Sequence, residues 1–217
     1  DVPILDADYT SGAVVIAVDE AIAVGETHTY LVTVTFTVDS QTATPTSLDC
    51  TAQTSENGTG TLNTATVTWD EGDDDDEDCE PIPSFVITKV ATTETDTAVP
   101  VDGADSTYTV TYDVTVTNNG GAMATYSATD VPAFGAGATI TEVKVGGTTI
   151  TDYVAGDTID LIAKSKLVAP DAPDTGSLAV GASATYVVEV TFTVAATMPA
   201  GDRTCDVAPG TRGDATY

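Results

Sequence analysis

The sequence predicts an all-β protein. Residues 24–38 read VGETHTYLVTVTFTV and residues 180–194 read VGASATYVVEVTFTV, so ten of fifteen positions are identical. In both copies β-branched and aromatic residues alternate with small or polar ones, which is the period of two of a half-buried strand. A convincing helical period occurs nowhere in the chain. The repeat indicates tandem β modules.

Other alternating segments predict the remaining strands in order. Residues 61–69, TLNTATVTW, are expected to be the closing strand of a first module, with Trp69 in its core. A new first strand opens at SFVITKVA, and residues 106–119 alternate most clearly of all. Asn118 to Gly121 then predict a hairpin turn with residues of positive φ.

The repeats also predict where the modules divide. Residues 1–80 are expected to be the C-terminal portion of one module, and residues 84–217 most of the next. The acidic run that ends at Pro83 closes the first module, and residues 81–83 form a stiff, proline-containing linker. Each predicted module lacks a strand of its sheet, which would be supplied by covalent neighbours or by strands exchanged between chains.

Spacing predicts an insertion in the second module. An Asp-Val-Pro triplet lies 23 positions before the first repeat, at Asp1, but 50 positions before the second, at Asp130. The 27 extra residues fall at about 147–175, where a surface loop is expected. Apolar residues within the insertion predict that part of it pairs as an extra hairpin; they are Ile150, Ile159 and Leu161.

Many short strands separated by Gly, Asn and Pro favour immunoglobulin-like β-sandwiches. The runs STYTVTYDVTVTNNG, TDVPAFGAG, VGxxxTYxVxVTFTV and NTATVTW resemble bacterial surface repeats of the DUF11 family. The resemblance covers essentially the whole chain, in two permuted pieces. It implies tandem immunoglobulin-like modules on large secreted proteins, with a stalk, adhesin or matrix role and no enzymatic activity.

Composition limits the partners. The chain has 34 acidic and 6 basic residues and a net charge of −28. Nucleic acids and anionic membranes require clusters of Lys and Arg, so both are excluded as partners. No run approaches the roughly 20 apolar residues that span a bilayer. The acid excess suits either solubility and divalent-cation binding in salty water or repulsion between secreted surfaces.

The three cysteines predict a disulfide. Cys50 and Cys79 flank the predicted closing strand, and Cys205 corresponds in the repeat to Cys50, so its partner is expected outside the chain. A disulfide is favoured in a secreted chain, and reduced structural thiols are the alternative. Zinc is disfavoured, because the chain has one histidine and no C-x₂-C spacing.

The family resemblance implies an intramolecular isopeptide bond. Lys89 on a first strand and Asn63 on a closing strand would each pair with a residue of an adjacent module. Asp113 or Glu189 would polarise the amide while a desolvated, neutral lysine attacks it. The alternative is an ordinary strand lysine whose head group reaches water.

The acidic run offers a calcium site. Hard cations prefer several carboxylate oxygens, and the candidate ligands are Asp73, Asp74, Asp75, Asp76, Glu77 and Asp78. The alternative is a solvated, self-repelling linker, because the run lacks the spacing of an EF-hand loop. No other cofactor is expected.

These observations predict a non-enzymatic, extracellular structural protein that forms a cell-surface stalk, fibre or filament with copies of itself or adjacent repeats. In one variant, strand 61–69 completes the sandwich of a neighbouring chain. The alternative is an adhesin whose 147–175 insertion, which carries Lys164 and Lys166, binds a glycan or protein. An enzyme is disfavoured, because no nucleophile–base pair is evident.

Overall fold

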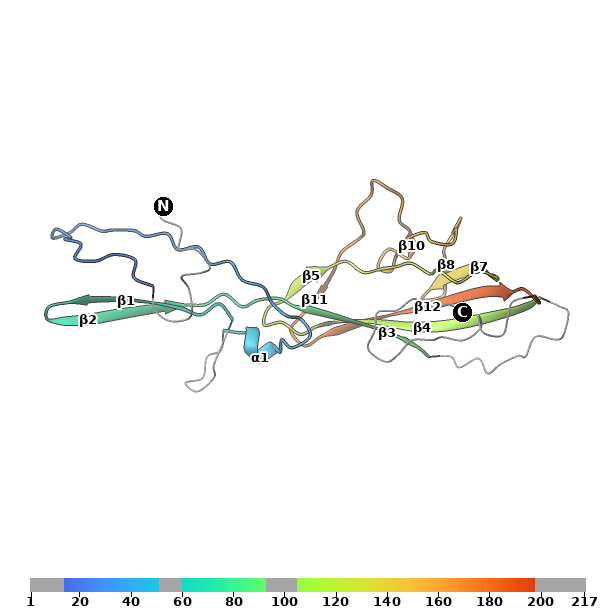
Figure 1. Cartoon of the computed structure of the whole chain (residues 1–217), viewed down its shortest axis with the longest axis horizontal. Helices are drawn as coiled ribbons and strands as arrows, with labels where there is room; N and C mark the ends of the chain where they lie inside the picture. The colour runs from blue at the N-terminus through green and yellow to red at the C-terminus, as the bar shows by residue number, and fades with distance from the viewer. Residues whose placement is uncertain (1–13, 51–59, 93–104, 198–217) are drawn as a thin grey trace. The chain divides into compact units, whose positions relative to one another are not determined.

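The computed structural model describes residues 14–50, 60–92 and 105–197 (Figure 1). The chain divides into two units, residues 1–37 and 38–217, each of which is described by itself. This division differs from the expected linker at 81–83. The reason is that residues 40–48 hydrogen-bond to the turn after strand β4 (Ser106–Asn118).

The first unit does not form the predicted strand. Residues 14–37 have no helix or strand, and all of them are exposed. Tyr30 is 48% exposed, Val34 67% and Phe36 51%. The prediction of a strand at 24–38 is therefore wrong here, because alternation makes a strand only when a neighbouring backbone takes up the hydrogen bonds. The two copies of the repeat consequently lie in unlike surroundings.

The second unit is built on a five-stranded antiparallel sheet. Its strand order is β3 (Phe85–Ala91), β4 (Ser106–Asn118), β12 (Ser183–Val194), β7 (Ala138–Val145) and β8 (Thr148–Thr149). Strands β4 and β12 pair along twelve residues, from Ser106–Val194 to Thr117–Ser183. The strands predicted in the second module are therefore confirmed.

Short strands form a second layer. β5 (Ala124–Tyr126) pairs with β11 (Gly176–Leu178), and β9 (Ile159–Asp160) lies between β6 (Thr129–Asp130) and β10 (Ser165–Lys166). One hydrophobic core contains residues of this layer and of the five-stranded sheet. The buried residues are Val110, Val114, Val116, Ala128, Val143, Val145, Ile150, Ile159, Leu161, Leu178, Val188, Val190, Phe192 and Val194.

The 147–175 insertion belongs to this core. Its β9–β10 hairpin confirms the expected extra hairpin. Ile159 and Leu161 are 0% exposed and Ile150 is 4% exposed. The expectation of a plain surface loop is therefore wrong, because these three side chains supply apolar area that the second layer needs.

Alternation separates the two faces of the sheet. Even-numbered residues of β4 and β12 face the core, and the odd-numbered residues form what we call the threonine face. There, hydroxyl pairs connect the two strands: Thr109–Thr191 at 3.0 Å, Thr115–Thr185 at 2.9 Å and Thr117–Ser183 at 2.8 Å. Cross-strand hydroxyl pairs of this kind stabilise a sheet.

A short helix, α1 (Pro45–Leu48), packs beside the turn after β4. Thr44 caps α1 in a capping box with Ser47. The Asn119 side-chain amide donates to the carbonyls of Ser40 (2.8 Å) and Ala43 (3.1 Å). These bonds fix residues 40–48 to the turn after β4.

The predicted positive φ at Gly120 and Gly121 is not observed. Close approach of backbones accounts for both glycines instead. A Cβ at Gly120 would lie 2.2 Å from the Ser84 nitrogen, and one at Gly121 would lie 2.1 Å from the Leu48 oxygen.

Strands β1 (Asn63–Trp69) and β2 (Gly72–Asp78) form a two-stranded antiparallel hairpin, which we call the acidic hairpin. The acidic run is therefore not a linker. Every carboxylate of β2 stays exposed to water and faces a neutral residue of β1, which limits the repulsion across the hairpin. A strand is confirmed at Asn63–Trp69, but among the described strands it pairs only with β2, and Trp69 is 52% exposed and not in a core. Its role as the closing strand of a sandwich remains a prediction.

Candidate functional site: the acidic hairpin and the outer edge of β3

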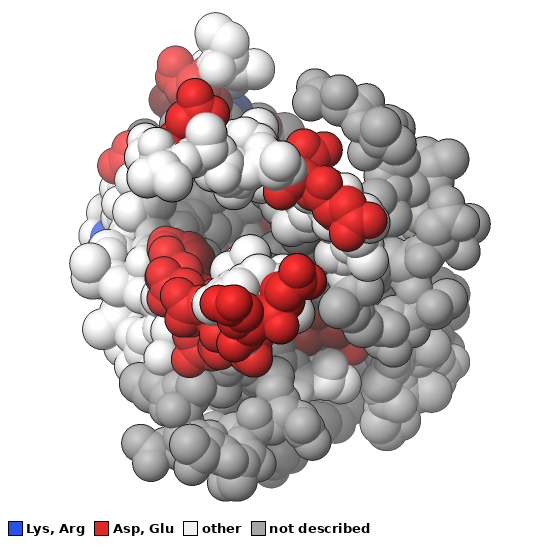
Figure 2. All heavy atoms as spheres, turned by 90° about the vertical axis from the view of Figure 1, so that its left-hand side faces the viewer, with Lys and Arg blue, Asp and Glu red and all other residues white. Residues whose placement is uncertain are grey.

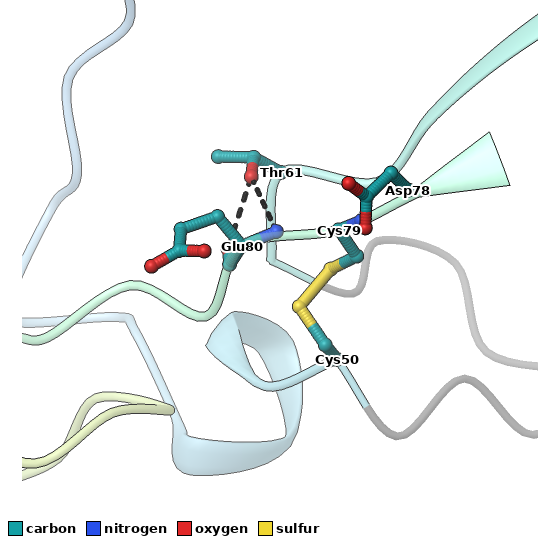
Figure 3. Close-up of a disulfide and its surroundings, with 5 residues drawn as sticks. All are labelled: Cys50, Thr61, Asp78, Cys79 and Glu80. Carbon is teal, nitrogen blue, oxygen red and sulfur yellow. Dashed lines mark hydrogen bonds between the residues drawn. A yellow bond between two sulfur atoms is a disulfide. The ribbon is translucent and has the colours of Figure 1, made fainter.

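A disulfide fixes the base of the acidic hairpin. Cys50 and Cys79 are bonded at 2.04 Å, as predicted (Figure 3). Beside them the Thr61 hydroxyl donates to the Glu80 carbonyl (2.9 Å) and accepts from the Glu80 N–H (3.0 Å). The disulfide joins Cys79, directly after β2, to Cys50, two residues after α1. Cys205 lies outside the described residues.

The carboxylates of β2 form two stripes. Asp73, Asp75 and Glu77 share one face with the threonines of β1, and Asp74, Asp76 and Asp78 share the other. Asp and Glu side chains exposed on the side turned toward the viewer are drawn in red in Figure 2. Neighbours within a stripe are about 7 Å apart along an extended strand.

This geometry does not surround a cation. Calcium ligands converge at about 2.4 Å from one ion, whereas adjacent residues of β2 point to opposite faces. Among residues 14–50, 60–92 and 105–197, no group of three or more His, Cys, Asp or Glu is placed to hold a metal. Calcium binding by Asp73–Asp78 remains a prediction.

Strand β1 contrasts with β2. Its sequence, NTATVTW, has no charged residue. Ala65, Val67 and Trp69 lie on one face, and Val67 is 57% exposed and Trp69 52% exposed. Among the described strands, β1 pairs only with β2. Its second side, which we call the outer edge of β1, therefore has no strand partner within the described ranges.

Strand β3 is also unpaired on one side. It bonds β4 and no other described strand, which leaves an outer edge of β3. Ile87 lies opposite Val116, a buried residue of β4, and so faces the core side of the sheet. Ile87 is nevertheless 53% exposed. The core side of β3 is therefore uncovered at Ile87.

Lys89 does not meet the partners expected for an isopeptide bond. Its Nζ lies 2.7 and 2.8 Å from the two oxygens of Asp130 on β6, and 4.6 Å from the centre of the Tyr112 ring. The pair connects the two layers, and the side chains of Lys89 and Asp130 are 37% and 11% exposed.

The proposed acids lie elsewhere. Lys89 pairs with Val114 on the core side, whereas Asp113 pairs with Val90 and Val187 on the threonine face, as does Glu189 with Thr111. Asn63 lies in β1 opposite Asp78. The isopeptide bond remains a prediction. Alternation alone places Lys89 on the core face, and this was the sequence signal for a partner in the second layer.

Asp160 of β9 is 2% exposed, and no motif in the sequence marks it. Its Oδ1 accepts the N–H groups of Ile162 (2.8 Å) and Ala163 (2.9 Å), and its Oδ2 accepts that of Asp174. The carboxylate thus holds two bends of the insertion. Only its position between apolar residues hinted at burial.

Three side chains with a shifted pKa each hydrogen-bond to a neighbouring side chain. Burial raises the pKa of the Tyr186 hydroxyl, which lies 2.6 Å from that of Tyr126. The hydrogen bond from Lys166 lowers the pKa of Asp157 within the insertion. Lys144 lowers the pKa of Glu142 in the same way on the surface of β7.

An open cavity of about 380 Å³ lies beside the insertion. Its lining is Thr141, Glu142, Thr149, Ile150, Asp152 and Tyr153. The Tyr153 hydroxyl donates to the Pro132 carbonyl, so this ring is held in place. Burial raises the pKa of the hydroxyl.

Comparison with protein-family models, with curated proteins and with solved structures finds no match to this chain. The resemblance to the DUF11 family therefore remains a prediction. In the described segments, no helix has the length and apolar character needed to cross a bilayer.

Proposed function

We propose that the chain is a non-enzymatic structural module of an extracellular stalk, fibre or filament, in which modules of immunoglobulin-like type follow one another. One observation carries this proposal. A disulfide-anchored hairpin with an uncharged, exposed strand occurs in the same chain as a two-layer core, and the edge of this core's sheet at β3 has no strand partner among the described residues. Such a chain has the parts needed to join end to end with adjacent repeats or with copies of itself.

The disulfide and the charge support an extracellular place. Disulfides persist in oxidising compartments and are rare in the cytosol. A net charge of −28 keeps modules apart except where a specific contact offsets the repulsion.

The test is microscopy of cells that produce the chain. Antibodies against the purified chain should label continuous filaments or a layer outside the cell, and cells from which the gene is deleted should lose both label and structure. Label confined to the cell interior would contradict the proposal. Label outside the cell with no ordered structure would contradict the fibre role alone.

The cavity beside the insertion favours a second candidate, an adhesin. Carboxylates, hydroxyls and a fixed aromatic ring around an open cavity suit a carbohydrate, which offers hydroxyls and an apolar ring face. Deleting residues 147–175 is not a clean test, because Ile159 and Leu161 belong to the core. Point substitutions in the lining are better.

A glycan array separates the two candidates. For an adhesin, the chain binds a defined glycan, Asp152→Asn with Glu142→Gln abolishes binding, and Asp171→Asn, an exposed substitution of the same insertion away from the cavity, retains it. Absence of binding by the unmodified chain, or equal binding by all variants, would contradict the adhesin.

A further inference from the structure

We propose that β1 of one copy adds to the outer edge of β3 in a second copy, with Ala65, Val67 and Trp69 covering the exposed core side at Ile87. This inference rests on the proposed function and names its assembly contact. It is a strand addition, in which backbone hydrogen bonds provide affinity and alternate side chains provide specificity.

The donor strand has what strand addition requires. β1 is seven residues long, carries no charge and presents three apolar side chains on one face. All seven residues are exposed in the single copy. Burying Val67 and Trp69 therefore removes apolar area from water without first breaking a contact with the core.

Charge selects which edge of the acidic hairpin approaches another molecule. Six consecutive carboxylates occupy β2, and the partner copy carries the same net charge of −28. An approach by β2 would bring like charges together, whereas β1 keeps β2 on the far side of the contact. Charged edge strands prevent further pairing in many sheets. The edge at β1 can therefore pair with another strand, whereas the charges at the edge of β2 disfavour such pairing.

The acceptor matches the donor in length and in faces. β3 also has seven residues, and Phe85, Ile87, Lys89 and Ala91 face the core side. Ile87 remains 53% exposed there, although Val116 beside it is 4% exposed. A strand added at this edge extends the core over Ile87 with the apolar face of β1.

Within one copy, a fold-back at the connection between β2 and β3 does not bring β1 beside β3. Folding back between β2 and β3 would place β2, not β1, beside β3, and would bring six carboxylates to the edge. Hydrogen bonds also hold the connecting residues: Ile82 donates to Leu48 (2.9 Å), Gly121 donates to Ile82 (2.8 Å) and Asn119 donates to Ser84 (2.9 Å). These bonds fix the described connection between β2 and β3, and we therefore assign the donor strand to a second copy.

The experiment compares charge placed on the two faces of each strand in the full chain. Val67→Asp changes the face predicted to be buried, and Thr66→Asp adds the same charge to the opposite face. Ile87→Asp and Thr88→Asp form the matching pair on β3. All four residues are exposed in the single copy, so the substitutions preserve its fold. Circular dichroism confirms this for each variant.

Assembly is measured by light scattering after size exclusion, with sodium chloride near 1 M to screen the net charge. We expect the unmodified chain, Thr66→Asp and Thr88→Asp to assemble, and Val67→Asp and Ile87→Asp to require at least about tenfold higher concentration. A mixture of Val67→Asp and Ile87→Asp should form one-to-one dimers that do not grow, because each variant keeps one intact partner surface.

Three results would overturn the inference: an unmodified chain that stays monomeric, assembly that Val67→Asp leaves unchanged, or a mixture that gives no dimer. Assembly that persists in Val67→Asp would remove this contact but leave the structural role intact. The labelling experiment on cells tests that role independently.

Discussion

Single buried polar residues organise the second layer. Asp160 is 2% exposed and accepts three backbone N–H groups from the insertion, and Asn118 is 0% exposed and donates to the carbonyls of Ala122 (2.8 Å) and Leu178 (3.0 Å). Buried polar groups are retained when their hydrogen bonds are complete. Hydrogen bonds from these two side chains therefore hold segments of the second layer in which strand pairing is short.

We expect Asp160→Asn to lower the free energy of unfolding by about 2 kcal/mol, because the NH₂ group of asparagine then faces backbone N–H donors and cannot accept from them. Urea unfolding followed by circular dichroism measures the change. Asp171→Asn, an exposed control in the same insertion, should stay within about 0.5 kcal/mol of the unmodified chain. An equal effect of both substitutions would show that Asp160 does not hold the insertion.

The sequence predicted few of the contacts between individual side chains. The repeat correctly paired Cys50 with Cys79. It could not pair Lys89 with Asp130, because their contact depends on how the second layer lies over the sheet and not on spacing along the chain. It also assigned Gly120 and Gly121 to a positive φ, because a glycine that gives room to another backbone has the same sequence signal as one in a turn.

Among the elements, the acidic hairpin depends on its base. Isolated two-stranded hairpins are marginally stable in water, and β1 and β2 pair only with each other among the described strands. The Cys50–Cys79 bond closes a separation of 29 residues that includes the whole hairpin. We therefore treat the disulfide as the condition for a folded donor strand.

Replacing Cys50 and Cys79 by serine should release the hairpin alone. Closing a loop of this size contributes about 3 kcal/mol, so hydrogen exchange at β1 and β2 should accelerate about 100-fold. Exchange at β4 and β12 should stay unchanged. Cys205→Ser serves as the control for loss of a cysteine. Unchanged exchange in β1 and β2 would mean that the disulfide does not support the hairpin.

The charge of β2 should weaken the hairpin at low salt. Neutralising Asp74 and Asp76, which share one face, with asparagine should stabilise the hairpin by about 0.5 kcal/mol in dilute buffer. The gain should vanish near 1 M salt, where the screening length is about 3 Å. Hydrogen exchange of β1 measures both values. A gain that persists at high salt would indicate a cause other than repulsion.

Periodicity predicted the elements that find partners. β4 and β12 both alternate, and they pair with each other. Residues 24–37 alternate as β12 does, but they form no strand. Alternation can be read from one segment, but a strand forms only when a second segment pairs with its backbone. The acidic run shows the converse: composition suggested a linker, but pairing with the neutral β1 makes it a strand.

For the whole molecule, we expect protection to follow the layers. A protease that cleaves after glutamate should cut at Glu20 and Glu26 well before Glu189, because the first two lie in an exposed segment without strands and Glu189 lies in the central β12. Mass spectrometry of timed samples gives the order. Cleavage at Glu189 as early as at Glu20 would contradict the assignment of the five-stranded sheet as the stable part.

The close approach of the backbone to Gly121 limits which residues this position can hold. A single methyl group at Gly121 would lie 2.1 Å from the Leu48 carbonyl oxygen. Gly121→Ala would therefore force the end of α1 away from this turn, while the Cys50–Cys79 disulfide still ties the segment to the acidic hairpin. In any related sequence, a glycine at this position would indicate that the α1 segment packs against this turn, and a larger residue would indicate that it does not.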